Sequence, residues 1–536
     1  MRVAAFAAVT AAVVAWLVIA GLQIADGGFY SDDWAIQWEW DTYGYSEAVS
    51  RQFDILGSKP LLAIILPSSY EVLGTDPVWH HLLAASLGLA TAAMFYLVLR
   101  GLRFESRDAI PITLLALLFP WASAVRLWPT GSVNNFAILL LFAGMLIALR
   151  ALRVEGPRGL IVHVAATACF AASVLTYEVT TGVALFFWLS YVWLAGWRPA
   201  LPRALMDVSA VSAAAIYSKE NTYKYVGSFT EQVEHIPDIL RDGADLIAAS
   251  LLPVEQPAVI APALTAAILG GALAILALAA LRGRLRDGDP ASRSGLRWAT
   301  VATVALGALG LCWAIYVPQA FYTPTFRGLE DRVNIVALYP AAILVWAVLR
   351  AAGSLVPKNG YVLAVAGSVA ILGGYWANDL RQQRDWAEST DLQEEVLSEI
   401  ERANAPDSSV VLAFGYPADV APRVPVLNVT YDLYPAAQLR TGTAIQTYPV
   451  FAGARVRCSP KGVALDRLVT PLYDKITLRD WGTPKLNAYS QVVFVDVGRR
   501  RHALITSPEQ CAKALKEFGP GPWLRGRPGN ERFPIR

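Results

Sequence analysis

The sequence predicts a polytopic α-helical membrane protein with an α/β domain outside the membrane at its C-terminal end. Of the 536 residues, 55% are hydrophobic and only 16% are charged, and the mean hydropathy is +0.41. A chain of this composition is too apolar for a soluble enzyme and too regularly segmented for a disordered protein. After Trp376 the chain becomes more polar. We therefore expect a membrane module in residues 1–376 and a soluble domain in residues 377–536.

Long apolar runs recur along the membrane module, and an α-helix needs about 20 apolar residues to cross a bilayer. The first run follows Met1-Arg2. It is too long for a signal peptide and no clear cleavage site follows it, so we expect a retained span. Counting all of the runs gives about eleven spans. The runs are Val3–Ile24, Val78–Leu99, Ala109–Ala124, Val133–Leu149, Leu160–Leu175, Thr181–Leu194, Leu205–Ile216, Ala258–Leu281, Trp298–Val317, Val333–Leu349 and Tyr361–Trp376.

Basic residues are distributed unequally between the two sets of turns that connect these spans. If Arg2 lies inside the cell, every cytoplasmic turn is basic, as the positive-inside rule requires. The basic residues of these turns are Arg100, Arg103, Arg107, Arg150, Arg153, Arg158, Arg198, Arg203, Arg282, Arg284, Arg286, Arg293, Arg297, Arg350 and Lys358. We expect a multi-pass protein of the plasma membrane with a cytoplasmic N-terminus. The loop 25–77 and the C-terminal domain are then extracytoplasmic.

Two patterns in residues 377–536 predict a small α/β domain. Apolar residues at helical spacing predict a helix over Asp391–Ala403, and Ser409–Phe414 and Gln491–Val497 are typical of buried strands. Cys458 and Cys511 also lie in this part of the chain. They would form a disulfide in an oxidising compartment and remain thiols in a reducing one.

An acidic pair follows the first span in the stretch Gly27-Gly28-Phe29-Tyr30-Ser31-Asp32-Asp33-Trp34. Two adjacent carboxylates at the margin of a bilayer are unfavourable unless they pair, bind a cation or take part in chemistry. Asp32 and Asp33 are therefore candidates for a general base, or for a divalent cation site. The alternative is structural, because Ser31 or Asp32 could cap the next helix while the other carboxylate faces its dipole.

Two further segments of the same loop complete a pattern. Lys59-Pro60-Leu61 follows the acidic pair, and Gly74-Thr75-Asp76-Pro77 leads into the second span. Together with Asp32-Asp33-Trp34, these motifs resemble those of the GT-C glycosyltransferases, which use polyprenyl-phosphate sugars as donors. That superfamily includes protein O-mannosyltransferases, aminoarabinose transferases that act on lipid A, and arabinofuranosyltransferases of the cell wall. The resemblance is to motifs within residues 1–110, where His80-His81 replaces an arginine of the aminoarabinose group.

The resemblance implies a GT-C-like fold and an inverting transfer of a hexosyl or pentosyl group. The donor would be a polyprenyl-phosphate sugar, and the acceptor a hydroxyl of a cell-envelope glycan, glycolipid or protein. Asp32, or else Asp33, is then the base, and Lys59 matches a phosphate-contacting lysine. One lysine is insufficient for a departing phosphate, so we add Arg327 and Arg332 because guanidinium binds phosphate through paired hydrogen bonds.

Three weaker candidates for contacts with the acceptor or the sugar lie at external ends of spans. They are Trp34, Arg126 and Glu178. Each has a structural alternative, because Trp34 is typical of an aromatic belt, Arg126 could anchor the chain at the interface, and Glu178 could pair with a lysine. Arg332 could likewise pair with an acidic residue of Glu330-Asp331.

Two other classes of protein are compatible with these observations. A transporter or flippase of a lipid-linked sugar would break no bond. Transporters place charged residues within spans, whereas the ionisable residues here gather at external span ends. A scaffold would use the acidic pair only as a helix cap. The sequence contains no nucleic-acid motif, zinc ligand set or glycine-rich phosphate loop. We therefore expect lipid and saccharide partners, and no nucleic acid.

Overall fold

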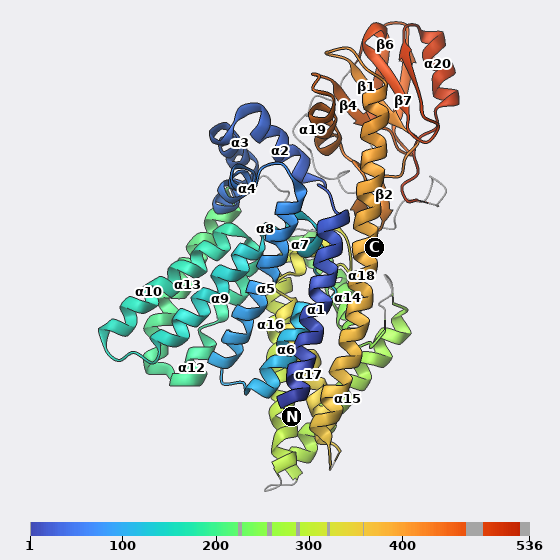
Figure 1. The fold of residues 1–536 in the computed structure, drawn as a ribbon. Helices are drawn as coiled ribbons and strands as arrows, with labels where there is room; N and C mark the ends of the chain where they lie inside the picture. Colours follow the sequence, from blue (N-terminus) through green and yellow to red (C-terminus); the bar gives the residue numbers. More distant parts are fainter. Residues whose placement is uncertain are drawn as a thin grey trace.

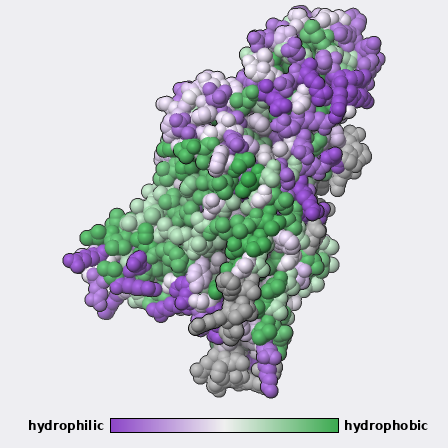
Figure 2. Space-filling view, viewed as in Figure 1, coloured by the Kyte–Doolittle hydropathy of each residue, from purple (hydrophilic) through white to green (hydrophobic). Residues whose placement is uncertain are grey.

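The computed structural model describes residues 2–222, 228–254, 260–285, 290–318, 322–356, 358–467 and 486–525. These residues form a helical bundle with a sheet-containing domain at one end (Figure 1). The surface of the bundle is apolar over a broad band, and polar residues gather on the domain and at the opposite end (Figure 2). The chain is thus a multi-pass membrane protein with a polar domain beyond the apolar band.

Eight helical segments of the described residues are long and apolar enough to cross a bilayer. Some of these segments are interrupted by a short break. The elements concerned are α1 (Arg2–Asp26), α5 (Pro77–Gly101), α8 (Pro129–Val133) with α9 (Asn135–Ala151), α10 (Pro157–Thr176), η1 (Glu178–Thr180) with α11 (Thr181–Phe186) and α12 (Leu189–Ala195), α15 (Pro262–Leu285), α16 (Pro290–Trp313) and α18 (Gly360–Arg402).

The remaining predicted spans also overlap helices. They correspond to α13 (Trp197–Glu220), α17 (Leu338–Ser354) and α6 (Ser106–Leu117). α6 is shorter than the predicted span Ala109–Ala124 because Pro120 follows it, and the residue before a proline is disfavoured in the helical conformation. The chain then forms two short helical turns, α7 (Ala124–Leu127) and α8, before it re-enters the bundle in α9.

The loop that carries the acidic pair is helical and lies above the bundle (Figure 1). It contains α2 (Asp32–Tyr43), α3 (Tyr45–Leu56) and α4 (Pro60–Leu73). Gly44 has φ 77°, a value that suits glycine, and lets the chain reverse between α2 and α3. α2 and α4 share a small apolar core built around Phe29, Ile36 and Tyr70, so this loop is a packed unit.

Three further elements of the described chain lie between the segments already named. They are α14 (Phe229–Ser250), η2 (Ala314–Tyr316) and η3 (Leu329–Asn334). The sequence analysis predicted no helix corresponding to α14.

One helix joins the bundle to the C-terminal domain (Figure 1). α18 has 43 residues and at 1.5 Å per residue is about 65 Å long. It contains the predicted last span, Tyr361–Trp376, and all but the last residue of the predicted helix Asp391–Ala403. The expected boundary between the two parts, at residue 376, lies within this continuous helix.

The C-terminal domain is built on a four-stranded sheet with strand order β4-β1-β7-β8. β1 pairs in parallel with β4 and β7, and β7 pairs antiparallel with β8. The predicted strands Ser409–Phe414 and Gln491–Val497 are confirmed as β1 and β7. The elements are β1 (Val410–Phe414), β2 (Asp419–Ala421), β3 (Val424–Pro425), α19 (Thr430–Thr441), β4 (Gln446–Pro449), β5 (Arg455–Ser459), β6 (Gly462–Arg467), η4 (Tyr489–Gln491), β7 (Val492–Asp496), β8 (Arg501–Ile505) and α20 (Pro508–Glu517).

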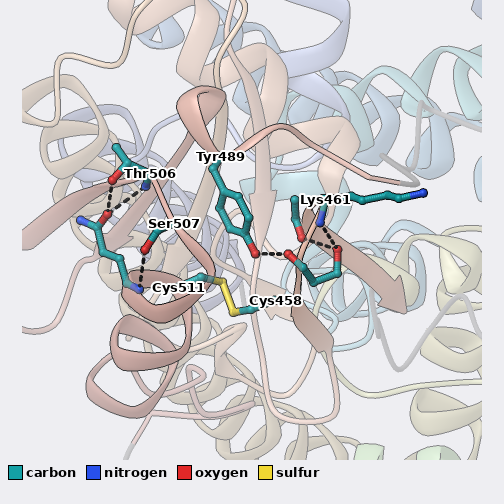
Figure 3. Close-up of a disulfide and its surroundings, with 9 residues drawn as sticks. Cys458, Lys461, Tyr489, Thr506, Ser507 and Cys511 are labelled. Carbon is teal, nitrogen blue, oxygen red and sulfur yellow. Dashed lines mark hydrogen bonds between the residues drawn. A yellow bond between two sulfur atoms is a disulfide. The ribbon is translucent and has the colours of Figure 1, made fainter.

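A disulfide links Cys458 in β5 to Cys511 in α20 (Figure 3). The hydroxyl of Tyr489 donates to the carbonyl of Ser459 beside it. The sequence left open whether these cysteines form a disulfide or remain thiols, and in the structure they form the disulfide. The bond connects the β5–β6 hairpin to the helix that packs on β8.

Candidate active site

The residues between α1 and α2 are fixed against α18. Tyr30 is fully buried, and its hydroxyl donates to the carbonyl of Trp386 at 3.0 Å and lies 2.8 Å from the hydroxyl of Thr390. Gly28 packs so closely on Thr390 that a Cβ atom would lie 2.8 Å from its methyl carbon. Ser31 has φ 47°, which a residue with a side chain adopts only under constraint. Tertiary contacts therefore place the start of α2.

Asp33 is a buried structural carboxylate. One oxygen accepts hydrogen bonds from the amide and the hydroxyl of Thr130, at 2.8 and 2.5 Å, and the other accepts from the amide of Tyr30 at 2.8 Å. Burial raises the pKa of Asp33 to about 7, although these hydrogen bonds act in the opposite direction. The side chain thus ties the start of α2 to α8 and is not available to a substrate.

Asp32 differs from its neighbour in exposure. Its side chain is partly exposed, and it accepts no hydrogen bond from the residues that the structure describes. The sequence left a base and a helix cap as alternatives for the pair. In the structure Asp33 has the structural contacts, and Asp32 is the carboxylate that a hydroxyl can approach.

A second buried aspartate fixes the neighbouring turn. Asp331 in η3 accepts hydrogen bonds from the amide and hydroxyl of Ser123 and from the amide of Ala124, at 2.6 to 2.9 Å, and so caps α7. Glu330 forms an ion pair with Arg423 of the C-terminal domain. The two acidic neighbours of Arg332 are therefore held by other partners.

Lys59 and Arg332, two of the three predicted phosphate ligands, line one small cavity. Its volume is about 20 Å³, roughly the space of one water molecule. The Lys59 ammonium lies 3.3 Å from Glu178 and 4.5 Å from the ring centroid of Tyr177. Tyr322 also lines the cavity. The predicted pairing of Glu178 with a lysine is thus present, and it occurs inside the cationic cavity.

Trp128 connects this cavity to the acidic pair. Its indole nitrogen donates to the carbonyl of Tyr30 at 2.9 Å, and the guanidinium carbon of Arg332 lies 4.9 Å from the centroid of its ring. Thr130, two residues further along the chain, binds Asp33. The acidic pair and the cationic cavity are therefore on either side of one short segment, residues 128–130.

The other predicted site residues are placed elsewhere, and none lines the described cavity. The side chain of Arg327 is buried and lies 3.4 Å from the amide oxygen of Asn378. Arg126 forms a buried ion pair with Asp379 at 2.6 Å. The remaining one, Trp34, donates to Gln393 of α18 at 2.8 Å. All three side chains contact residues of α18.

Sequence reasoning missed Trp128, Thr130, Tyr177 and Tyr322. The bond from Thr130 to Asp33 joins residues 97 positions apart, and no local pattern indicates such a contact. Tyr177 had a weak signal, since it directly precedes Glu178 at the end of an apolar run. These residues were found from the fold.

Charged residues also lie inside the bundle, which corrects the expectation that they gather only at external span ends. Asp207 of α13 is fully buried and accepts from Tyr191 at 2.8 Å and from Thr167 at 2.6 Å. His163 lies 3.1 Å from the same carboxylate. Such a cluster joins α10, α12 and α13, as polar groups commonly do between membrane helices.

The acidic pair is a poor fit to a metal ion. Both oxygens of Asp33 are already occupied by N–H and O–H donors. Among the described residues, no group of three or more His, Cys, Asp or Glu side chains converges. The candidate residues therefore offer a base and cations, and we assign them no metal.

No protein-family model matches this sequence, and no curated protein matches it. Among solved structures, the chain is similar to ArnT from Cupriavidus metallidurans in the apo state, with a TM-score of 0.33 and 13% identity over 83% of this chain and 86% of that one. It is also similar to the oligosaccharyltransferase of Archaeoglobus fulgidus in the apo form, with a TM-score of 0.39 and 11% identity. That match covers 82% of this chain and 64% of the other, less than two thirds. Likenesses this distant do not identify a donor, an acceptor or a reaction.

Proposed function

We propose that this chain is an inverting membrane glycosyltransferase. It moves a hexosyl or pentosyl group from a polyprenyl-phosphate donor to a hydroxyl of a cell-envelope glycan, glycolipid or protein. The observation that carries the proposal is the pairing of an accessible carboxylate, Asp32, with a cationic cavity across residues 128–130. A glycosyl transfer from a lipid phosphate needs these two groups, a base for the acceptor and positive charge for the leaving group.

Asp32 acts as the base in this proposal. The acceptor hydroxyl approaches its carboxylate, transfers its proton to it in the transition state and attacks the anomeric carbon from one side. The bond from that carbon to the phosphate oxygen breaks on the opposite side. A single displacement inverts the anomeric configuration, and Asp33 stays out of the chemistry because its oxygens are held by Tyr30 and Thr130.

Lys59 and Arg332 receive the departing phosphate. Lys59 is paired with Glu178, and Arg332 lines the same cavity. We infer that the phosphate takes the place of the Glu178 carboxylate beside Lys59. Arg332 adds a second, always protonated cation. Arg327 and Arg126 have buried partners elsewhere and are left out of this step.

Two observations support an extracytoplasmic site. The predicted cytoplasmic turns are basic, and the disulfide between Cys458 and Cys511 suits an oxidising compartment. The site lies at the same end of the bundle as that domain (Figure 1). We therefore place the reaction on the outer face of the plasma membrane.

The test is transfer of label from a panel of radiolabelled polyprenyl-phosphate sugars into membrane acceptors, with purified wild-type protein and the Asp32→Asn variant. We expect wild-type protein to transfer one sugar and the variant to lose at least about 100-fold in rate, the lower range for loss of general base catalysis. Asp26→Asn is the matched control, because Asp26 is an exposed carboxylate at the end of α1.

Full activity of a folded Asp32→Asn variant would refute the assigned base. If donors bind but none is consumed, even with membrane extract supplying acceptors, the protein is a transporter or flippase of lipid-linked sugars instead. A double variant with Asp33→Asn and Lys59→Met that is unchanged from wild type in folding, donor binding and transfer would indicate a scaffold.

A further inference from the structure

The C-terminal domain touches the helix that begins with the acidic pair. α19 lies between α2 and the sheet (Figure 1). The hydroxyls of Ser31 and Tyr431 are 3.1 Å apart, and the indole nitrogen of Trp38 donates to Gln438 at 2.8 Å. Contacts at 31 with 431 and at 38 with 438 require the two helices to run side by side in the same direction. The domain is therefore docked along α2.

The contact nearest to the acidic pair falls on a constrained residue. Ser31 is 3% exposed and has φ 47° and ψ −116°. A non-glycine residue keeps such a conformation only when its surroundings hold it there. The hydroxyl of Tyr431 is one of the groups that hold Ser31, and Asp32 directly follows Ser31 in the chain.

The side chain of Asp32 accepts no hydrogen bond from the described residues, so the direction of its carboxylate depends on the backbone that carries it. On one side that backbone is fixed by Asp33, through Tyr30 and Thr130 of the membrane module. On the other side it is fixed through Ser31 by Tyr431. The contacts of Asp33 lie within the membrane module. The contact of Ser31 with Tyr431 crosses to the C-terminal domain, at a sequence separation of 400.

We propose that Tyr431 is a positioning residue for Asp32, through its hydrogen bond to Ser31, and that the C-terminal domain is in this way part of the catalytic machinery. This inference rests on the proposed function, with Asp32 as the base. Tyr431 touches neither donor nor acceptor in this proposal. Its effect is therefore on the rate of the chemical step and not on the affinity for the donor.

The test is steady-state transfer by Tyr431→Phe, Ser31→Ala and the double variant, in the full-length protein. We expect Tyr431→Phe to lower kcat by about tenfold, because small displacements of a reacting group can cost up to about 100-fold. The donor KM should stay within a factor of about two, and the double variant should be no slower than the slower single variant, as expected for residues that act as one unit.

Tyr434→Phe is the matched control, because the ring of Tyr434 packs on Trp38 in the same interface, while its hydroxyl interacts with Gln438 of its own helix and not with Ser31. We expect it to retain wild-type kcat. Hydrogen exchange of the peptide covering residues 28–36 gives a readout that does not need activity, and it should become faster in Tyr431→Phe and stay unchanged in Tyr434→Phe.

Wild-type kcat and unchanged exchange in Tyr431→Phe would overturn the inference. If Asp32→Asn is inactive in the same assay, the proposed function survives that result. If Asp32→Asn is fully active, the base assignment fails, and so does the catalytic role of Tyr431. Faster exchange in Tyr431→Phe would then show only that the contact holds α2.

Discussion

Asp32 and Asp33 are adjacent in the chain, yet their surroundings assign them different tasks. Asp33 is fully buried between Tyr30 and Thr130, whereas Asp32 is partly exposed. The sequence indicated that a carboxylate here matters, but not which one. That distinction comes from Thr130, which reaches Asp33 from a segment 97 residues away.

The pKa of Asp33 predicts how stability depends on pH. An aspartate in an unfolded chain titrates near pH 4, whereas burial raises the pKa of Asp33 in the fold to about 7. The folded chain binds this proton more tightly, so the contribution of protonated Asp33 is fully present below about pH 4 and is lost as the pH rises through about 7.

We therefore expect the unfolding temperature of the wild type to fall relative to that of Asp33→Asn as the pH rises from about 5 to about 8, since only the wild type carries this titrating group. Thermal unfolding in detergent measures it. Asp26→Asn, which removes an exposed carboxylate, should show no such trend. A wild-type unfolding temperature that rises relative to that of Asp33→Asn over this pH range would contradict the raised pKa of Asp33.

At the scale of elements, the sequence predicted the apolar helices well and the polar elements poorly. Each predicted span overlaps a helix because a long apolar run in a bilayer has few other options. α7 and α8 were not predicted, because their two turns are held by Asp331 and Asp33 from other parts of the chain. The position of the cationic cavity depends on the same contacts.

α14 was also missed by the sequence prediction, and one side of this helix is apolar and exposed. Phe229, Val233, Ile236 and Leu240 form one stripe and are 81%, 48%, 37% and 65% exposed. His235, on a different side of the helix, binds the carbonyl of Tyr322 at 2.7 Å. An amphipathic helix with an uncovered apolar stripe beside membrane spans is typical of the bilayer interface.

We expect this stripe to contact lipid acyl chains. A fluorophore attached at Val233→Cys, in a chain with Cys169→Ser, should be quenched by lipids brominated in their acyl chains. The same fluorophore at Glu234→Cys, one residue away on the acidic side of α14, should be quenched much less. Equal quenching at both positions would exclude the interfacial placement.

At the scale of the whole molecule, the division into a membrane module and an α/β domain was predictable because it follows from hydropathy. The way the two parts meet was not. α18 passes through the expected boundary without a break, and α19 reaches back to α2 across a sequence separation of 400 residues. Contacts of this range leave no periodic pattern in either segment.

The orientation of the molecule is testable with cysteines introduced one at a time into a chain with Cys169→Ser, in which the other free thiol, Cys312, is buried. A membrane-impermeant maleimide added to intact cells should label Asp407→Cys, which is exposed in the C-terminal domain, and should leave Arg153→Cys unlabelled until the cells are opened. Labelling of Arg153→Cys in intact cells would reverse the orientation and move the proposed site to the cytoplasm.

Because α18 is continuous, its length sets the direction in which the C-terminal domain faces. Each residue of an α-helix adds a rotation of about 100° and a rise of about 1.5 Å. One alanine inserted after Glu395 lies beyond the contacts of Thr390 with Tyr30 and of Gln393 with Trp34. It would rotate the part of α18 that follows it by more than a quarter of a circle relative to the bundle. Four inserted residues would nearly restore the angle and lift the domain by about 6 Å. The rotational phase of this one helix therefore helps to set whether α19 meets α2, together with the contacts of Arg423 with η3 and of Pro425 with Ser389.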